Sequence, residues 1–211
     1  AEQRFVDGLS KLLPEAGFIA EEGTGARGAE LNWVIDPLDG TTNFIHGFPQ
    51  YAVSIALAYK GQINQAVIYD TLRNEMFTAS KGGGAYLNER RIRVTKCVKL
   101  EDALLGTGFP FRIFDHVDAY LGIFKEFTQR SSGIRRTGSA ALDLAYVACG
   151  RLDGFWEFGI MPWDMAAGCL LISEAGGLVG DLSGGENYLK TGNIIAGTPK
   201  VFGPLLKLIE E

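Results

Sequence analysis

Hydrophobic residues recur with a helical period at the start of the chain. Within residues 2–13, Phe5, Leu9 and Leu12 fall on one face of a helix, and Pro14 ends the pattern. We therefore expect an amphipathic helix over this stretch, packed through that face.

The pattern then changes to strands. Residues 51–59 alternate strictly between large apolar side chains and small ones, which predicts a strand with one face packed closely against a neighbouring element. Further strands are expected at 31–35, 63–69, 75–79, 85–87 and 92–94. Turn residues such as Gly82–Gly84 and Asn88-Glu89 separate them, so this region is predicted to be an antiparallel meander.

Helices and strands alternate in the second half of the chain. Helices are expected at 117–127, 140–148 and 164–175 and after Pro204, and strands at 155–158, 178–181 and 193–196. Ser139 and Asp164 stand where the N-caps of two of these helices would lie. The order favours an α+β or layered α/β fold. We expect a single domain over 1–211, with an N-terminal lobe of about 1–110 and a C-terminal lobe of about 111–211.

Composition excludes several classes of protein. The chain of 211 residues has 20 Lys and Arg against 25 Asp and Glu, a net charge of −5, and 46% hydrophobic residues, which is ordinary for a globular protein. The acidic balance argues against a generic nucleic-acid binder or a basic membrane-surface protein. No apolar run approaches the roughly 18 residues of a membrane span. With no signal peptide and three scattered cysteines, we expect a cytoplasmic protein.

Two aspartates stand out by their spacing. Asp36 and Asp39 follow a predicted strand directly, in a turn shaped by Pro37 and Gly40. Carboxylates held this closely repel each other unless a cation lies between them, and their oxygens suit Mg²⁺ rather than zinc. The alternative is an Asx-type turn that caps the next short helix.

Neighbouring residues add an anion site. Gly40, Thr41 and Thr42 present successive backbone N–H groups at a helix start, where an anion is favoured. A cation site beside an anion site indicates a phosphate ester bound through metal. Asp164 offers a further carboxylate at a helix start, although taken alone it is better explained as a plain N-cap aspartate. The Glu21-Glu22 pair taken alone is typical of a solvated surface.

Longer segments make a family recognisable. Residues 33–44 (WVIDPLDGTTNF) resemble the first signature of the inositol monophosphatase family, and 162–168 (PWDMAAG) followed by 174–177 (EAGG) resemble its second. Segments 138–145 and 154–157 also resemble that family, in the same order. The resemblance covers essentially the whole chain and is closest to bacterial members. It implies the five-layer αβαβα sandwich of the inositol monophosphatase and fructose-1,6-bisphosphatase type.

The resemblance also implies a set of site residues. Two or three Mg²⁺ ions are expected on Glu21, Asp36, Asp39, Asp164 and the backbone carbonyl of Leu38. Asp36 would bridge ions, while Thr41, with Glu21 behind it, would orient and deprotonate the attacking water. Gly40 and Thr41 would hold the phosphate oxygens.

The resemblance further implies contacts to the alcohol part of the substrate. The family pattern places Asp164, Glu157 and the segment Gly138, Ser139 and Ala140 against the inositol hydroxyls, with Ser139 where the family has threonine. Glu157 also reads as a surface charge at a strand end. Family members begin with a further helix and an aspartate, so we expect that a segment preceding residue 1 is missing.

The resemblance implies a Mg²⁺-dependent, lithium-sensitive phosphatase of inositol 1-phosphate that forms a homodimer. Within the superfamily, fructose 1,6-bisphosphate, histidinol phosphate or a 3′-phosphoadenosine nucleotide are alternative substrates. A regulatory protein that acts on RNA or the transcription machinery is a further alternative. Its contact patches would be Arg90, Arg91, Arg93 and Lys96, or Arg130, Arg135 and Arg136, which otherwise read as solvated surface.

Overall fold

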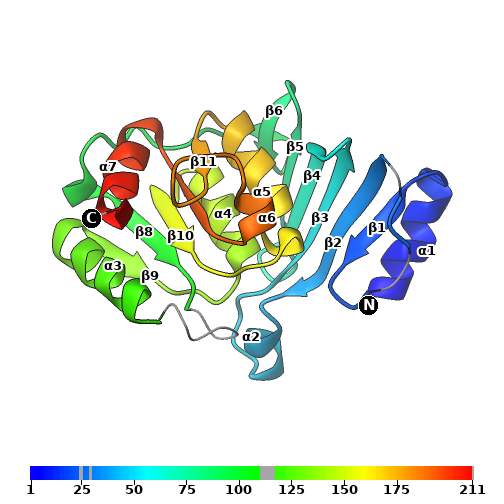
Figure 1. Ribbon diagram of the computed structural model, residues 1–211. Helices are drawn as coiled ribbons and strands as arrows, with labels where there is room; N and C mark the ends of the chain where they lie inside the picture. The colour runs from blue at the N-terminus through cyan, green and yellow to red at the C-terminus, as the bar shows by residue number, and fades with distance from the viewer. Residues whose placement is uncertain (24–25, 29, 110–116, 211) are drawn as a thin grey trace.

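The chain folds into alternating layers of helices and sheets (Figure 1). The computed structural model describes residues 1–23, 26–28, 30–109 and 117–210. Helix α1 (Glu2–Leu12) packs on the outer face of a seven-stranded sheet at its first strands, and α4 (Ala140–Ala148) and α5 (Pro162–Glu174) separate this sheet from a five-stranded one. Helices α3 (Val117–Arg130) and α7 (Pro199–Glu210) form the far layer. The predicted layered α/β fold is confirmed.

The first sheet follows the order of the sequence. Its strands are β1 (Gly17–Ala20), β2 (Leu31–Asp39), β3 (Ala52–Tyr59), β4 (Gln62–Asp70), β5 (Glu75–Ser80), β6 (Gly84–Leu87) and β7 (Arg90–Arg91). From β2 onward all neighbours are antiparallel, which confirms the meander, whereas β1 was not predicted and pairs with β2 in parallel.

The edge strand of this sheet lies earlier than predicted. Asn88 and Glu89 both have positive φ and form a tight turn, which brings Arg90 and Arg91 opposite Leu87 and Tyr86. The assigned strand therefore ends at Arg91, just before the apolar residues 92–94 that predicted it, although the Ile92 N–H still donates to the Ala85 carbonyl at 2.9 Å.

The second sheet mixes parallel and antiparallel pairs. Its order is β11-β12-β10-β8-β9, built from β8 (Leu104–Thr107), β9 (Gly133–Arg135), β10 (Gly154–Glu157), β11 (Leu178–Gly180) and β12 (Ile194–Gly197). A short α2 (Thr41–Ile45), α6 (Tyr188–Thr191) and a 3₁₀ turn (Leu100–Asp102) complete the described elements. Strands β8 and β9 were not predicted, because segments of three or four residues carry too little alternation to be read as strands.

Small residues allow the central layer to approach both sheets. The small side chains of β3, including Ala52, Ala56 and Ala58, are buried in the same core as α5, which confirms the close packing expected of that face. Between the two helices, a Cβ added at Gly168 would lie 2.4 Å from the Cβ of Leu144. The helices therefore touch at a point that admits no side chain.

Two helix starts differ from the sequence expectation. Met161 is the N-cap of α5 and Asp164 is its third residue, because Pro162 suits the first helical turn. Helix α7 begins at Pro199 and contains Pro204 rather than following it. Val201 and Leu205 are fully buried on its inner face, and this burial outweighs the backbone hydrogen bond that Pro204 cannot make.

None of the helices among the described residues combines the length and the apolar character that crossing a bilayer requires.

Candidate active site

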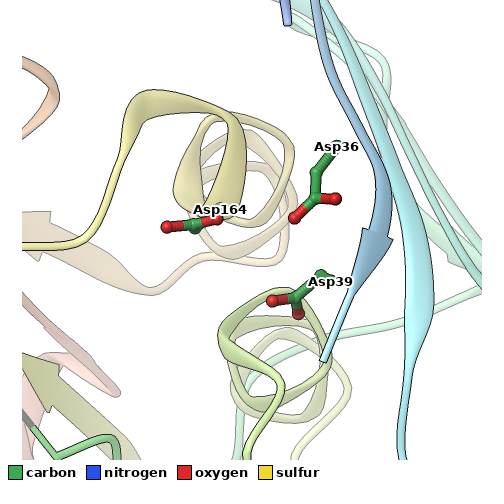
Figure 2. Close-up of side chains that lie close together, drawn as sticks. All are labelled: Asp36, Asp39 and Asp164. Carbon is green, nitrogen blue, oxygen red and sulfur yellow. The ribbon is translucent and has the colours of Figure 1, made fainter. Parts of the chain in front are cut away.

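Three aspartates converge between the first sheet and the central helices. Oxygen atoms of Asp36, Asp39 and Asp164 all lie within 4.8 Å of one another. Asp36 and Asp39 come from the end of β2 and Asp164 from the first turn of α5, so the cluster joins segments more than 120 residues apart in the chain (Figure 2). Asp36 and Asp39 are buried, being 2% and 8% exposed.

A strand irregularity brings the two β2 aspartates together. In a regular strand, residues three apart point to opposite faces of the sheet. Here the register with β3 shifts between Asp36, which faces Ser54, and Asp39, which faces Ala52. An Asp36 Oδ1 that accepts from the Leu38 N–H at 2.8 Å stabilises the bend. Both carboxylates therefore turn toward the central helices.

The carboxylates of Asp39 and Asp164 are oriented by the starts of two helices. Asp39 Oδ2 accepts from the Ser139 hydroxyl at 2.5 Å and from the Ala141 N–H at 2.8 Å, both at the beginning of α4. Asp164 Oδ2 accepts from the Met161 N–H at 2.7 Å. These bonds restrict the rotation of each side chain, so the cluster geometry is largely built before any ligand binds.

The electrostatics of the cluster favour a cation. Burial, followed by the nearby charge of Asp39, raises the pKa of Asp36 to about 9. Burial and the charge of Asp164 raise the pKa of Asp39 to about 7. Among the described residues, neither Asp36 nor Asp39 forms an ion pair with a basic side chain. Oxygen ligands in a buried and negatively charged cluster fit a divalent hard cation such as Mg²⁺.

Glu21 reaches the same pocket from the end of β1. It lines the cavity beside Asp36, and its charge contributes to the raised pKa of Asp36. Its own N–H donates to the Ile35 carbonyl at 3.3 Å, which keeps this segment alongside β2. The next residue, Glu22, donates its N–H to Glu2 Oε2 at 2.8 Å, and Glu2 of α1 is completely buried. Helix α1 therefore holds the backbone that carries Glu21.

We expect that Glu2→Ala weakens metal binding without unfolding the protein. Removing the acceptor of the Glu22 N–H frees the backbone beside Glu21, and loss of such a supporting contact typically costs about tenfold in metal affinity. Calorimetric titration with Mg²⁺ measures this. Glu2→Gln keeps an oxygen acceptor and should bind nearly as well as the wild type, while Gln3→Ala on the exposed face of α1 is the control. Equal affinity in Glu2→Ala would contradict the prediction.

The start of α2 lies against the cluster. Gly40 has φ +88°, and a Cβ there would lie 2.8 Å from the Gln50 carbonyl oxygen, so no other residue fits. The Thr41 hydroxyl donates to the Leu38 carbonyl at 2.9 Å. The hydroxyl proton of Thr41 is used in this bond. The lone pairs of Thr41 Oγ1 therefore remain available to accept a hydrogen bond from a donor such as water.

The opposite wall carries the residues predicted for the alcohol. Glu157 ends β10 and is buried, not at the surface as its alternative reading had it. Its carboxylate lies over the bare backbone of Gly108, where a Cβ would come within 1.9 Å of Glu157 Oε1. Burial, followed by the charges of Asp143 and Asp39, raises the pKa of Glu157 well above its usual range. Ser139 is 1% exposed, and its hydroxyl is used to orient Asp39.

One cavity of about 460 Å³ brings all the predicted site residues together. It is lined by Glu21, Asp36, Leu38, Asp39, Gly40, Thr41, Gly138, Ser139, Ala140, Glu157 and Asp164. Their roles as ligands and contacts stay predictions.

The cavity also contains residues that sequence reasoning missed. Asn43 stands inside the first signature, but nothing in the sequence shows what it contacts. Thr107 is the last residue of β8, a strand that was not predicted, and Gly108 follows it. Arg136, read from sequence as part of a surface patch, is the single basic residue among the described residues that line the cavity.

Comparisons with known proteins show which sequences and folds this chain is similar to. The model of the inositol monophosphatase family matches residues 1–211. The Nus factor SuhB of Pseudomonas aeruginosa is 55% identical over 216 residues, which span 100% of this chain and 80% of that protein. The crystal structure of the extragenic suppressor protein suhB from Bartonella henselae superposes with a TM-score of 0.96 at 45% identity, covering 100% of this chain and 81% of the other. The structure of inositol monophosphatase from Anabaena gives a TM-score of 0.93 at 39% identity, with 99% and 84% covered.

Proposed function

The chain belongs to the inositol monophosphatase family, and we propose that it is a Mg²⁺-dependent phosphatase that converts inositol 1-phosphate into inositol and phosphate. The observation that carries the proposal is the cluster of Asp36, Asp39 and Asp164, two of them buried and the third partly buried, in one cavity with the Gly40-Thr41 turn. We further propose that Glu21 and the Leu38 carbonyl complete the metal site, that two or three ions bind, and that Li⁺ inhibits.

The residues of the chain have distinct parts in this proposal. Asp36, Asp39, Asp164, Glu21 and the Leu38 carbonyl hold the metal. Bound Mg²⁺ ions would lower the pKa of a coordinated water and stabilise the departing oxygen. The lone pairs of Thr41 Oγ1 accept a hydrogen bond from the attacking water, since its own proton goes to Leu38. The N–H groups of Gly40 and Thr41 bind the phosphate oxygens.

The alcohol is proposed to lie on the opposite wall of the cavity. Glu157 would accept hydrogen bonds from inositol hydroxyls, while Gly138 and Ala140 leave room for the ring beside Ser139 and Asp164. The burial of Glu157 supports this role, because a buried carboxylate facing a cavity needs a hydrogen-bonding partner there.

The direct test is release of phosphate from inositol 1-phosphate, measured with and without Mg²⁺ and with added Li⁺. Activity that requires Mg²⁺ and is lowered by Li⁺ is expected, and activity without any metal would overturn the site assignment. Fructose 1,6-bisphosphate, histidinol phosphate and a 3′-phosphoadenosine nucleotide should be turned over more slowly. Comparable rates on fructose 1,6-bisphosphate would contradict a specific inositol phosphatase.

We also propose that the protein is a homodimer and is cytoplasmic. Gel filtration tests the homodimer, and cell fractionation tests the location.

A regulatory role is a second candidate. Its support is the name Nus factor SuhB, borne by the Pseudomonas aeruginosa relative at 55% identity. The two roles separate in a bacterium in which this chain replaces the resident homologue and carries Asp36→Asn. A growth phenotype restored by the inactive variant would assign the effect to a partner rather than to catalysis.

A further inference from the structure

Two turns form facing walls of the cavity. The turn at Gly40 leads into α2 and carries the proposed phosphate contacts. The turn at 137–139 leads into α4 and carries the proposed alcohol contacts. The first turn follows β2 of the seven-stranded sheet and the second follows β9 of the five-stranded sheet. The distance between the two turns therefore depends on contacts across the cavity.

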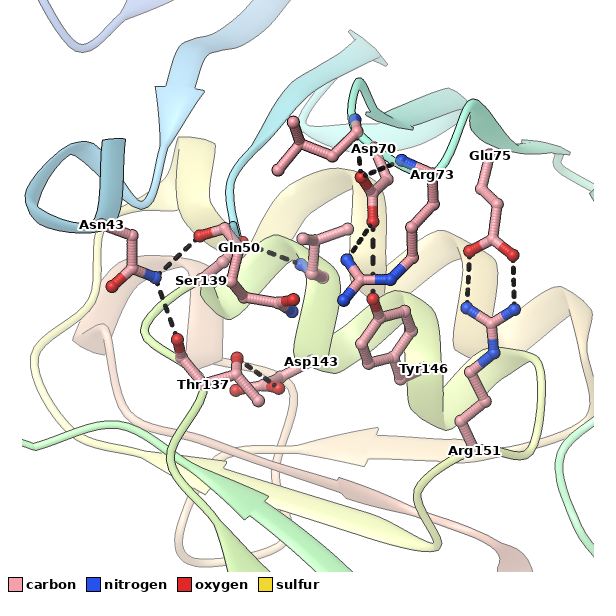
Figure 3. A network of polar contacts seen from close by, with 12 residues as sticks. Asn43, Gln50, Asp70, Arg73, Glu75, Thr137, Ser139, Asp143, Tyr146 and Arg151 are labelled. Carbon is pink, nitrogen blue, oxygen red and sulfur yellow. Dashed lines mark hydrogen bonds and ion pairs between the residues drawn. The ribbon is translucent and has the colours of Figure 1, made fainter. Parts of the chain in front are cut away.

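Asn43 of α2 spans this distance. Its side-chain Nδ2 donates to the carbonyl of Gln50 at 2.7 Å and to the carbonyl of Thr137 at 2.9 Å, the latter 94 residues away in sequence (Figure 3). An amide nitrogen has two hydrogens, and both are used. One side chain thus ties α2, the start of the β3 segment and the turn before α4 to one another.

Gly138 leaves room for the side chain of Asn43 because it has no side chain of its own. It has φ +87°, and a Cβ there would lie 2.8 Å from Asn43 Nδ2 and 3.0 Å from Asn43 Oδ1. The backbone of this turn therefore lies directly against the amide, and the two cannot move closer. The hydrogen bond to Thr137 prevents them from moving apart.

Further hydrogen bonds hold the turn on both sides. Thr137 Oγ1 donates to Asp143 Oδ1 at 2.8 Å, and the Ser139 hydroxyl donates to Asp39. The Ala141 and Leu142 N–H groups donate to Asp39 and to Ser139 Oγ. A shift at Thr137 would consequently move the groups that orient Asp39 and the walls around the alcohol.

We propose that Asn43 is a positioning residue that sets the distance between the phosphate-binding turn and the alcohol-binding turn. It touches neither the reacting atoms nor the metal ligands in this assignment. The inference rests on the proposed phosphatase function for its kinetic consequence. The phosphate half stays anchored to β2 when Asn43 is removed. The turn at 137–139 then loses the link from Thr137 to α2 and stays tied to that half through the bonds that Ser139 and Ala141 donate to Asp39.

The kinetic test compares two esters. p-Nitrophenyl phosphate has a good leaving group without hydroxyls, so its hydrolysis does not depend on the alcohol contacts. Asn43→Ala should lower kcat/KM for inositol 1-phosphate between about tenfold and a hundredfold. For p-nitrophenyl phosphate the loss should stay below about threefold, because its reacting phosphate remains aligned. Equal losses for both esters would overturn the proposal.

Two further variants test whether the hydrogen bonds of Asn43, rather than its packing, produce the kinetic effect. Asn43→Leu keeps the shape that packs on Gly138 but has no donors, so it should behave like Asn43→Ala if the hydrogen bonds are what matters. Ile45→Ala, at an exposed position of the same short helix, is the control. Wild-type kcat/KM values for both esters in Asn43→Leu would overturn the proposed role of the amide.

Hydrogen–deuterium exchange tests the same contact without turnover. In metal-free protein, the amides of Ala141 and Leu142 should exchange faster in both Asn43 variants than in Ile45→Ala. Unchanged exchange overturns the inference whatever the substrate is. Failure of the wild type to hydrolyse inositol 1-phosphate counts instead against the proposed function, and the exchange result still decides the role of Asn43.

Discussion

Asp36→Asn should lower Mg²⁺-dependent phosphate release at least about a thousandfold. A metal site supplies several kcal/mol of transition-state stabilisation, and each 1.4 kcal/mol is a factor of ten in rate. A carboxylate oxygen of Asp36 lies within 4.8 Å of oxygens of both Asp39 and Asp164. The amide of asparagine keeps the shape but removes the charge that binds the cation.

The same variant should also lose its thermal response to metal. A ligand that binds the folded state raises the unfolding temperature, so Mg²⁺ should stabilise the wild type and leave Asp36→Asn unaffected. Asp118→Asn, on the exposed face of α3, makes the same chemical change away from the cavity and serves as the control. Residual activity within tenfold of the wild type would exclude Asp36 as a metal ligand.

Trp156→Ala should cost about 3–5 kcal/mol of unfolding free energy, which is the usual range for a large aromatic residue in a core. Trp156 is completely buried in β10, with its ring 4.6 Å from that of Phe127 and 6.2 Å from that of Tyr120, centroid to centroid. These contacts attach α3 to the second sheet. Truncation leaves a cavity in this outer layer and removes the aromatic contacts together.

Urea unfolding followed by circular dichroism measures the loss. Leu121→Ala on the same outer helix removes an apolar side chain that is 53% exposed, and it should change stability by less than about 0.5 kcal/mol. A cost below about 1 kcal/mol in Trp156→Ala would mean that the outer layer contributes little to the stability of the second sheet.

The meander and the layered fold were predictable because their signals are local and repeated. Alternation along β3 and β4 extends over eight or nine residues, long enough to distinguish a strand from a helix. Strands β8 and β9 have four and three residues, and their positions follow from pairing with β10 and with each other. Short parallel strands are specified by their neighbours, which the local sequence does not describe.

By itself, the sequence determined the chemistry of the candidate site. The residues from Asp36 to Thr42 are contiguous, and their turn-forming residues keep two carboxylates and a helix start close together along the chain. Only the tertiary structure decided how this turn meets its partners. The approach of Asp164, the burial of Glu157, the support of Glu2 and the link through Asn43 all join distant segments. The packing of the layers sets those distances, since no local pattern records which faces meet.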